Sequence, residues 1–258
     1  ATGFSAPTWS GGTSKVWIDK LSVSGGTPPY SHWAYSTDPD FSGEGVIMGS
    51  LHDTAEVEIT TPLYVRVFDG NGCSSVARVE VTRQAIVLQA GWNLVSLNLS
   101  PGGASLRTLF GMLEQKGTLV KVLDEEGKSL ENLGLLGGWH DAIGRHRTTE
   151  GYKVKVNAAD TLLLWGQPLK MPLSIPLKAG WNIISFPLVE AQDALEVMGG
   201  LIARGTLVKV QDEKGHSLEN IGPQGGWVNQ IGLFQPGEGY KVRVVTDEEL
   251  VIDEASPQ

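Results

Sequence analysis

Two groups of neighbouring carboxylates are the residues in this chain whose types most readily support chemistry. Asp124, Glu125 and Glu126 form one group, Asp212 and Glu213 form the other, and each aspartate is followed three positions later by a glycine. Paired carboxylates can divide the roles of general acid and general base, or they can ligate calcium. Acids that precede a glycine are also typical of a solvated hairpin turn, and we favour this structural interpretation.

Oxygen-bearing side chains nearer the N-terminus raise the question of calcium. Asp38 and Asp40 lie in one predicted loop, and Asp69 and Asn71 lie in another. If the two loops converge, their carboxylate and amide oxygens suit calcium. The spacing is not that of an EF-hand loop, so the sequence leaves calcium binding open and predicts no definite metal site.

Histidine and cysteine show no pattern of a metal centre or of a nucleophile. The histidines are His32, His52, His140, His146 and His216. His140 and His146 lie six positions apart, and we expect them on the surface rather than in a metal site. Cys73, the only cysteine, cannot form an intrachain disulfide and is expected to be a small packed side chain. The sequence therefore predicts no catalytic residue, no metal site and no cofactor, and hence no enzyme.

The eight tryptophans are more informative. An indole ring can stack on the face of a pyranose ring, and it can equally fill a protein core. Trp92 and Trp181 follow a glycine in one motif, and Trp139 and Trp227 follow a glycine in another. A scaffold role is the simpler interpretation, with glycan binding by Trp139 and Trp227 as the alternative. The solvent exposure of these two rings distinguishes the interpretations.

These motifs recur because one pattern of almost 90 residues fills the last two thirds of the chain twice. Residues 117–156 and 205–244 are identical at 25 of 40 positions at an offset of 88. The sequence Ala-Gly-Trp-Asn precedes both segments, at residues 90–93 and 179–182. Alternating apolar residues predict six or seven strands in each copy. We therefore expect the two copies to share one fold.

One stretch of each copy has helical rather than strand spacing. In the first copy Leu106, Leu109, Phe110 and Leu113 recur on one helical face, and Gly117 follows as a C-terminal stop. In the second copy residues 194–202 show a similar pattern. Each copy is therefore expected to contain one short helix.

The first 83 residues read as short strands separated by turns. Asn71-Gly72 stands between two apolar runs and predicts a hairpin with a type I′ turn. Trp33 is expected in the core. Several short strands with frequent turns are typical of a small β-sandwich.

Parts of this segment resemble known surface modules. The motifs Gly25–Tyr30, Trp33 and Val67–Cys73 resemble the repeat of gliding-motility surface adhesins and the PKD-like immunoglobulin-type modules of bacterial surface proteins. The likeness spans residues 13–83. The Trp-Asp-Phe-Gly-Asp-Gly signature of PKD domains is absent, so the resemblance is to the broader immunoglobulin-like class. It implies an extracellular spacer or adhesive module without catalysis.

The two copies carry a resemblance of their own. Their Gly-Trp-Asn-x-x-Ser openings (residues 91–96 and 180–185), each with a later Glu-Gly-Tyr, resemble a β-rich module of long exported bacterial and archaeal proteins. That resemblance implies no activity.

Charge and hydropathy disfavour two kinds of partner. The net charge is −9, whereas nucleic-acid binding needs a basic face. No apolar run approaches the roughly 18 residues of a transmembrane helix, so we expect no membrane-spanning segment. The charge divides into −4 over residues 1–83, +1 over 84–172 and −6 over 173–258. The unequal charges of the two copies raise the hypothesis of head-to-tail pairing into a filament.

The sequence thus predicts a mainly β protein. An N-terminal immunoglobulin-like β-sandwich domain (1–83) precedes two homologous β-rich domains (84–172 and 173–258), each with one short helix. We expect a non-catalytic structural or adhesive protein, a stalk or filament subunit, located extracellularly or at the cell surface. Its expected partners are other copies of itself, other surface proteins and glycans. The alternatives are a carbohydrate-binding protein that uses exposed tryptophan and an accessory fragment of a larger exported enzyme.

Overall fold

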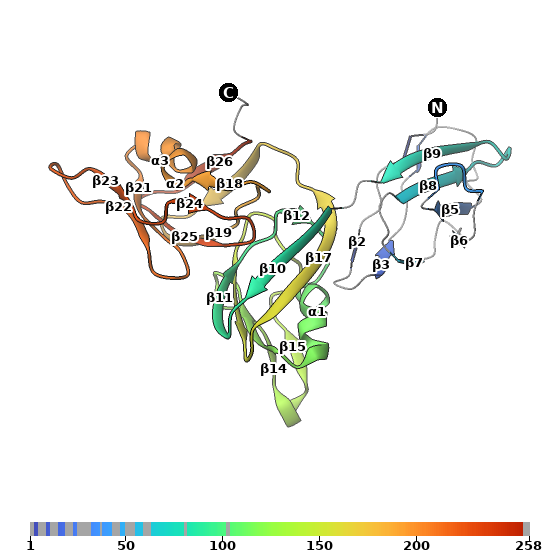
Figure 1. Cartoon of the computed structure of the whole chain (residues 1–258), viewed down its shortest axis with the longest axis horizontal. Coiled ribbons are helices and arrows are strands. Elements are labelled where there is room, and N and C mark those ends of the chain that lie inside the picture. Colours follow the sequence, from blue (N-terminus) through green and yellow to red (C-terminus); the bar gives the residue numbers. More distant parts are fainter. Residues whose placement is uncertain are drawn as a thin grey trace.

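The computed structural model describes most of the last two thirds of the chain and parts of the first third. The described residues are 3–4, 9–10, 15–18, 23–24, 32–36, 38–42, 47–49, 55–58, 63–79, 82–101 and 104–254. The protein is mainly β, with 48% strand and 11% helix, which confirms the predicted fold class at that level. Figure 1 shows the N-terminal strands to one side of a larger body that contains both repeats.

The N-terminal strands form three antiparallel sheets. Their orders are β1-β4, β2-β3-β7 and β6-β5-β8-β9. The strands are β1 (Gly3–Phe4), β2 (Trp9–Ser10), β3 (Lys15–Ile18), β4 (Val23–Ser24), β5 (His32–Ser36), β6 (Ile47–Gly49), β7 (Ala55–Glu58), β8 (Leu63–Phe68) and β9 (Ser74–Val79). The side chain of Trp33 lies outside the described residues, so the core role expected for it is not addressed.

The predicted hairpin between β8 and β9 is present, but its turn is not type I′. That turn needs a positive φ at both central residues, and of Asn71 and Gly72 only the glycine has one, at 77°. The carboxylate of Asp69 organises the loop instead, because its Oδ1 accepts hydrogen bonds from the amides of Asn71 and Cys73, both at 2.9 Å. An aspartate that caps its own loop replaces the backbone geometry we expected.

The first repeat contains two antiparallel sheets and one helix. In one sheet β17 (Asp160–Pro168) lies between β10 (Thr82–Leu88) and β12 (Leu99–Ser100). The other sheet has the order β11-β16-β13-β14-β15. Its strands are β11 (Gly91–Val95), β16 (Tyr152–Val156), β13 (Leu119–Leu123), β14 (Ser129–Asn132) and β15 (Trp139–Asp141). The helices are α1 (Leu106–Lys116) and a 3-10 turn, η1 (Gly134–Leu136).

The second repeat contains a five-stranded sheet of the same order, β19-β25-β21-β22-β23. Both five-stranded sheets shift register at the same place, between Leu119 and Lys121 and between Leu207 and Lys209. The strands are β19 (Gly180–Ile184), β25 (Tyr240–Val244), β21 (Leu207–Gln211), β22 (Ser217–Asn220) and β23 (Trp227–Asn229). The remaining pairs are β18 (Leu173–Leu177) with β26 (Glu248–Ile252), and β20 (Gln192–Asp193) with β24 (Leu233–Phe234).

The helix predicted for each repeat is continuous only in the first. In α1 the hydroxyl of Ser105 caps the N-terminus, Gly117 ends the helix with a φ of 72°, and the four predicted apolar residues are buried. In the second repeat the corresponding stretch forms α2 (Ala194–Val197) and α3 (Gly199–Ala203). Consecutive glycines at 199 and 200 disfavour helix interior by about 1 kcal/mol each relative to alanine. The prediction of one short helix is therefore wrong for this repeat.

Each repeat encloses its own apolar core. Residues from α1 and from both sheets form the first core, and the equivalent elements form the second. A tyrosine of the strand next to the edge strand is fully buried in each, Tyr152 on β16 and Tyr240 on β25. The sheets therefore each bury one face, and the opposite face of each five-stranded sheet is available for other contacts.

Candidate functional site

The acidic pairs lie on equivalent hairpin turns, between β13 and β14 and between β21 and β22. The first aspartate of each pair is buried and holds its own turn together. Asp124 Oδ1 accepts a hydrogen bond from the amide of Lys128, and Asp212 Oδ1 accepts one from the amide of His216, both at 2.8 Å. These two carboxylates are turn-forming groups.

The second acid of each pair reaches across to the other repeat. Glu213 Oε2 accepts a hydrogen bond from the amide of Leu94 at 2.9 Å. In the reciprocal contact Glu125 Oε2 accepts one from the amide of Ile183 at 3.1 Å. Both glutamates are exposed, as expected for a solvated turn, but each also makes a contact that the sequence did not predict. Each one satisfies a backbone donor on the exposed edge of the other repeat's sheet.

Further reciprocal hydrogen bonds surround these two contacts. The amide of Gly239 donates to the carbonyl of Leu94 at 2.8 Å, and the amide of Gly151 donates to the carbonyl of Ile183 at 3.0 Å. Two more amides extend the pattern, as Ser96 donates to Gly237 and Ser185 donates to Thr149. Every contact maps onto its twin by the offset of 88 or 89, so the two repeats meet about an approximate twofold axis. Each repeat covers the free edge strand, β11 or β19, of the other.

The Gly-Trp-Asn motif shapes the turn that leads into each edge strand. Asn93 is buried, its Oδ1 accepts from the amide of Gln89 at 2.8 Å, and its Nδ2 donates to the carbonyl of Gln89 at 2.8 Å. Asn182 makes the same pair of bonds with Lys178. Because the asparagine points inward, the preceding tryptophan points outward. Trp92 is 50% exposed and Trp181 is 49% exposed.

The tryptophans selected from the sequence as glycan candidates are the less exposed pair. Trp139 and Trp227 are half-buried and pack against the two cores. Trp92 and Trp181 are the exposed aromatic pair on the equivalent strands. Alternation along the strand could not predict the exposure of Trp92 and Trp181. Their neighbours Leu94 and Ile183, on the same edge strands, are buried by contacts with the other repeat.

A pocket of about 340 Å³ opens beside Trp92. Residues of both repeats line it: Trp92, Asn93, Leu94, Leu123, Lys153, Glu213 and Lys241. Lys153 and Lys241 are twins at an offset of 88, so the pocket lies close to the approximate twofold axis. The ammonium group of Lys155 lies 5.7 Å from the centroid of the Trp92 ring. The pocket therefore combines an aromatic wall with two lysines and one carboxylate, that of Glu213.

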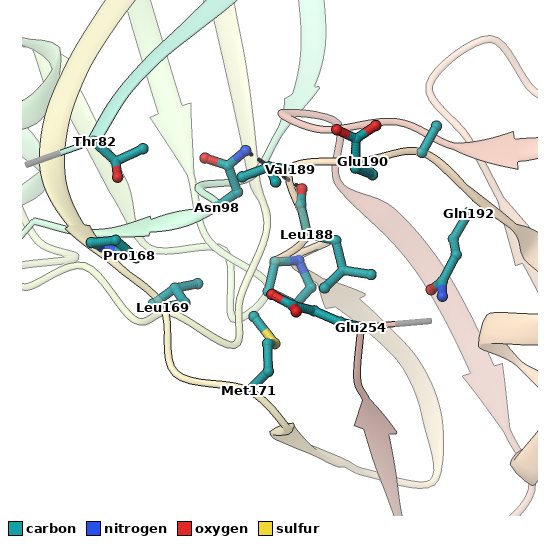
Figure 2. Close-up of a pocket in the computed structure, with 12 residues that line it drawn as sticks. Thr82, Asn98, Pro168, Leu169, Met171, Leu188, Val189, Glu190, Gln192 and Glu254 are labelled. Atoms are coloured by element: carbon teal, nitrogen blue, oxygen red, sulfur yellow. Dashed lines mark hydrogen bonds between the residues drawn. The ribbon is translucent and has the colours of Figure 1, made fainter. Parts of the chain in front are cut away.

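A second cavity, of about 430 Å³, lies between the repeats near the segment that joins them (Figure 2). Its walls are mostly apolar, and its charged lining residues are Glu190 and Glu254. The Nδ2 of Asn98 donates to the carbonyl of Leu188 at 3.4 Å, while its Oδ1 has no partner within the described part of the chain. This cavity is acidic, in contrast to the pocket beside Trp92.

The two histidines of the first repeat differ in burial. His140 is exposed, whereas His146 is buried, so the surface position expected for His146 is wrong. Burial lowers the pKa of His146 to about 4, because the charged imidazolium loses its hydration. The Nε2 of His146 has no hydrogen-bond partner among the described residues. This ring is a polar group inside an apolar core.

The acids proposed for calcium are engaged by their own loops. Asp38 accepts from the amides of Asp40 and Ser42 at 3.0 and 2.9 Å, and Asp69 holds the β8–β9 loop as described above. Within the described ranges, no group of three or more histidine, cysteine, aspartate or glutamate side chains is placed to hold a metal ion. Cys73 is an exposed free thiol rather than the packed side chain we expected. No helix in the described part of the chain is long and apolar enough to cross a membrane.

Comparison with protein-family models, with curated proteins and with solved structures finds no match to this chain.

Proposed function

We propose that this chain is a non-catalytic structural or adhesive protein, located extracellularly or at the cell surface. The observation that carries the proposal is the set of reciprocal hydrogen bonds between the two repeats. Glu125 and Glu213, the acids best placed in the sequence for chemistry, are each bound to a backbone amide of the other repeat. Two repeats joined by such contacts keep a fixed arrangement relative to each other. A stalk or a filament subunit needs this property.

The finer description of the fold belongs to the same proposal. Residues 1–83 form an immunoglobulin-like β-sandwich, and residues 84–172 and 173–258 are two homologous β-rich domains. The four-stranded and three-stranded N-terminal sheets support this description, as does the common strand order of the two repeats. The first strand of the first repeat, β10, begins at Thr82, so the boundary proposed after residue 83 falls within that strand.

Two experiments test this function. A panel of ester, glycoside and peptide substrates should show no turnover by the full chain, and turnover abolished by one point substitution would overturn the proposal. Negative-stain imaging and light scattering over a salt series should reveal whether copies assemble. Assembly that weakens above the screening range of about 0.1 M salt supports charge-guided pairing of unlike repeats.

Carbohydrate binding is the second candidate function, and the pocket beside Trp92 favours it. An exposed indole that lines a pocket can stack on a sugar ring, and a volume of about 340 Å³ falls within the size range of ligand sites. The test is quenching of tryptophan fluorescence by an array of oligosaccharides. The Trp92→Ala variant should lose the signal, and the Trp139→Phe variant should retain it.

A further inference from the structure

We propose that the surface formed by Trp92, Trp181 and the basic side chains of β16 and β25 binds an acidic polysaccharide. The proposal rests on the carbohydrate-binding candidate above and names its ligand class. It follows from strand register, from the pairing of charges on the surface and from the exposure of the two indoles.

Register places the basic residues beside the aromatic ones. The outward positions of β16 are Lys153 and Lys155, and those of β25 are Lys241 and Arg243, because the alternate residues of both strands are buried. Trp92 pairs directly with Lys155 across the first sheet, and Trp181 pairs with Arg243 across the second. Each repeat therefore presents one indole next to one cation at the same structural position.

The charges on these outer faces are unequally neutralised. Lys121 and Lys209, on the next strands, form ion pairs with Glu131 and Glu219, both at 2.9 Å. Within the part of the chain that the structure describes, the four basic side chains of β16 and β25 form no ion pair. Glu213 lines the same pocket as Lys153 and Lys241, so one carboxylate stands beside two ammonium groups there and leaves a positive excess. A ligand that carries carboxylate or sulfate groups supplies the missing anions.

The exposed indoles indicate that the ligand also carries sugar rings. Trp92 and Trp181 each keep about half of their surface open to solvent, and the apolar face of a pyranose ring can cover it. The Lys155 ammonium lies over the Trp92 ring, 5.7 Å from its centroid, so an acidic substituent of a sugar bound at this indole is within its reach. The combination fits an acidic sugar better than a neutral one.

The approximate twofold axis sets the number of sites. A polysaccharide chain has a direction, and the axis reverses that direction at the second indole, so each repeat binds its own segment. The first site adds the pocket with Lys153, Lys241 and Leu123, while Gln211 replaces Leu123 in the second. We therefore expect two sites of unequal affinity for each chain, with the site at Trp92 the tighter.

Calorimetry and tryptophan fluorescence on the full chain test the proposal. The probe is an oligogalacturonate of about six residues, compared with a neutral xylo-oligosaccharide of equal length and a single-stranded oligothymidylate. The expected result is binding of the oligogalacturonate that weakens with salt. Lys155→Gln should weaken it about tenfold, as should Trp92→Ala. Lys116→Gln, which removes the same charge at the end of α1, should change the affinity less than twofold.

Each other outcome overturns the inference in a different way. If the neutral oligosaccharide binds equally well and Lys155→Gln has no effect, carbohydrate binding stands and the acidic specificity is wrong. If no sugar binds, the carbohydrate candidate also fails. Tighter binding of the oligothymidylate would make the surface a nucleic-acid site. Loss of binding in Lys116→Gln would mean that the long-range field, and not this surface, attracts the ligand.

Discussion

The two repeats have the same sheet and the same mutual contacts, but they differ in the group that packs against the buried tyrosine. In the second repeat Phe234 stacks on Tyr240, with centroids 3.7 Å apart, and Phe186 meets both rings edge-on. In the first repeat His146 takes the place of Phe234 and lies 5.6 Å from Tyr152. One scaffold therefore accommodates either an aromatic cluster or a buried neutral imidazole.

The contacts between the repeats differ far less than the surfaces do. The net charges of the repeats differ by seven, from +1 over residues 84–172 to −6 over residues 173–258. The reciprocal glutamate and glycine contacts are nevertheless present in both directions. The architecture therefore depends on the backbone groups of the edge strands β11 and β19, which the other repeat binds. The charged residues elsewhere on the surface differ between the repeats.

The largest expected effect concerns acid stability and the difference between His146 and Phe234. The pKa of His146 is about 4 in the folded protein and about 6.5 in the unfolded chain, so the unfolded state binds more protons between these values. The stability that the neutral imidazole confers is present above pH 6.5 and is lost as the pH falls through 4. We expect this term to lower the free energy of unfolding by about 3 kcal/mol from pH 7.5 to pH 4.

The matched variant is His146→Phe, which installs the residue found in the second repeat. Urea unfolding at several pH values should show that the variant loses this part of the pH dependence. If the wild type and the variant have parallel stability curves from pH 7.5 to 4, His146 is not the titrating group and the comparison of the two cores fails.

The next effect concerns the twin glycines of the interface. A Cβ added at Gly151 would lie 2.7 Å from the carbonyl oxygen of Ile184, whereas one added at Gly239 would lie 3.2 Å from that of Val95. We expect Gly151→Ala to destabilise the protein by about 2 kcal/mol and Gly239→Ala by about 1 kcal/mol. Thermal unfolding of the two variants measures the difference. Equal effects would indicate that the interface adjusts, and that the small asymmetry has no energetic weight.

The reciprocal glutamates give a smaller and symmetric effect. Glu213→Ala leaves the amide of Leu94 without its partner, and Glu125→Ala does the same to Ile183. We expect each substitution to lower the free energy of unfolding by about 1–2 kcal/mol. The control is Glu126→Ala, since Glu126 lies on the same turn and forms an ion pair with the exposed Lys128. A large effect for one glutamate and none for the other would break the approximate symmetry.

The smallest effect on stability is expected for the exposed tryptophans. Trp92→Ala and Trp181→Ala remove half-exposed rings and should each change stability by less than about 1 kcal/mol. Trp139→Ala removes a ring packed on the core and should cost more. Urea titrations of the three variants check this order. If Trp92→Ala is the most destabilising, that ring is a structural element and its role as a binding surface is wrong.

Patterns within the chain predicted much of the local structure. The repeated segment indicated two copies of one unit, and both five-stranded sheets have the same order. The helical spacing of Leu106, Leu109 and Phe110 predicted α1, because the burial of one helical face follows directly from residue spacing. The β8–β9 hairpin was also predicted, although not the turn that Asp69 builds.

Contacts between distant residues could not be predicted in the same way. Glu213 binds an amide 119 positions away and Glu125 binds one 58 positions away. Every residue except proline offers the same backbone donor, so no side-chain pattern marks which amide a glutamate will reach. Alternation also did not distinguish the exposed Trp92 from the packed Trp139, because the burial of an indole depends on core residues that are distant in the sequence. Short-range spacing specified α1 and much of the strand pattern. The docking of one repeat on the other decided that Glu125 and Glu213 bind across the interface, and packing within each repeat decided which indoles face solvent.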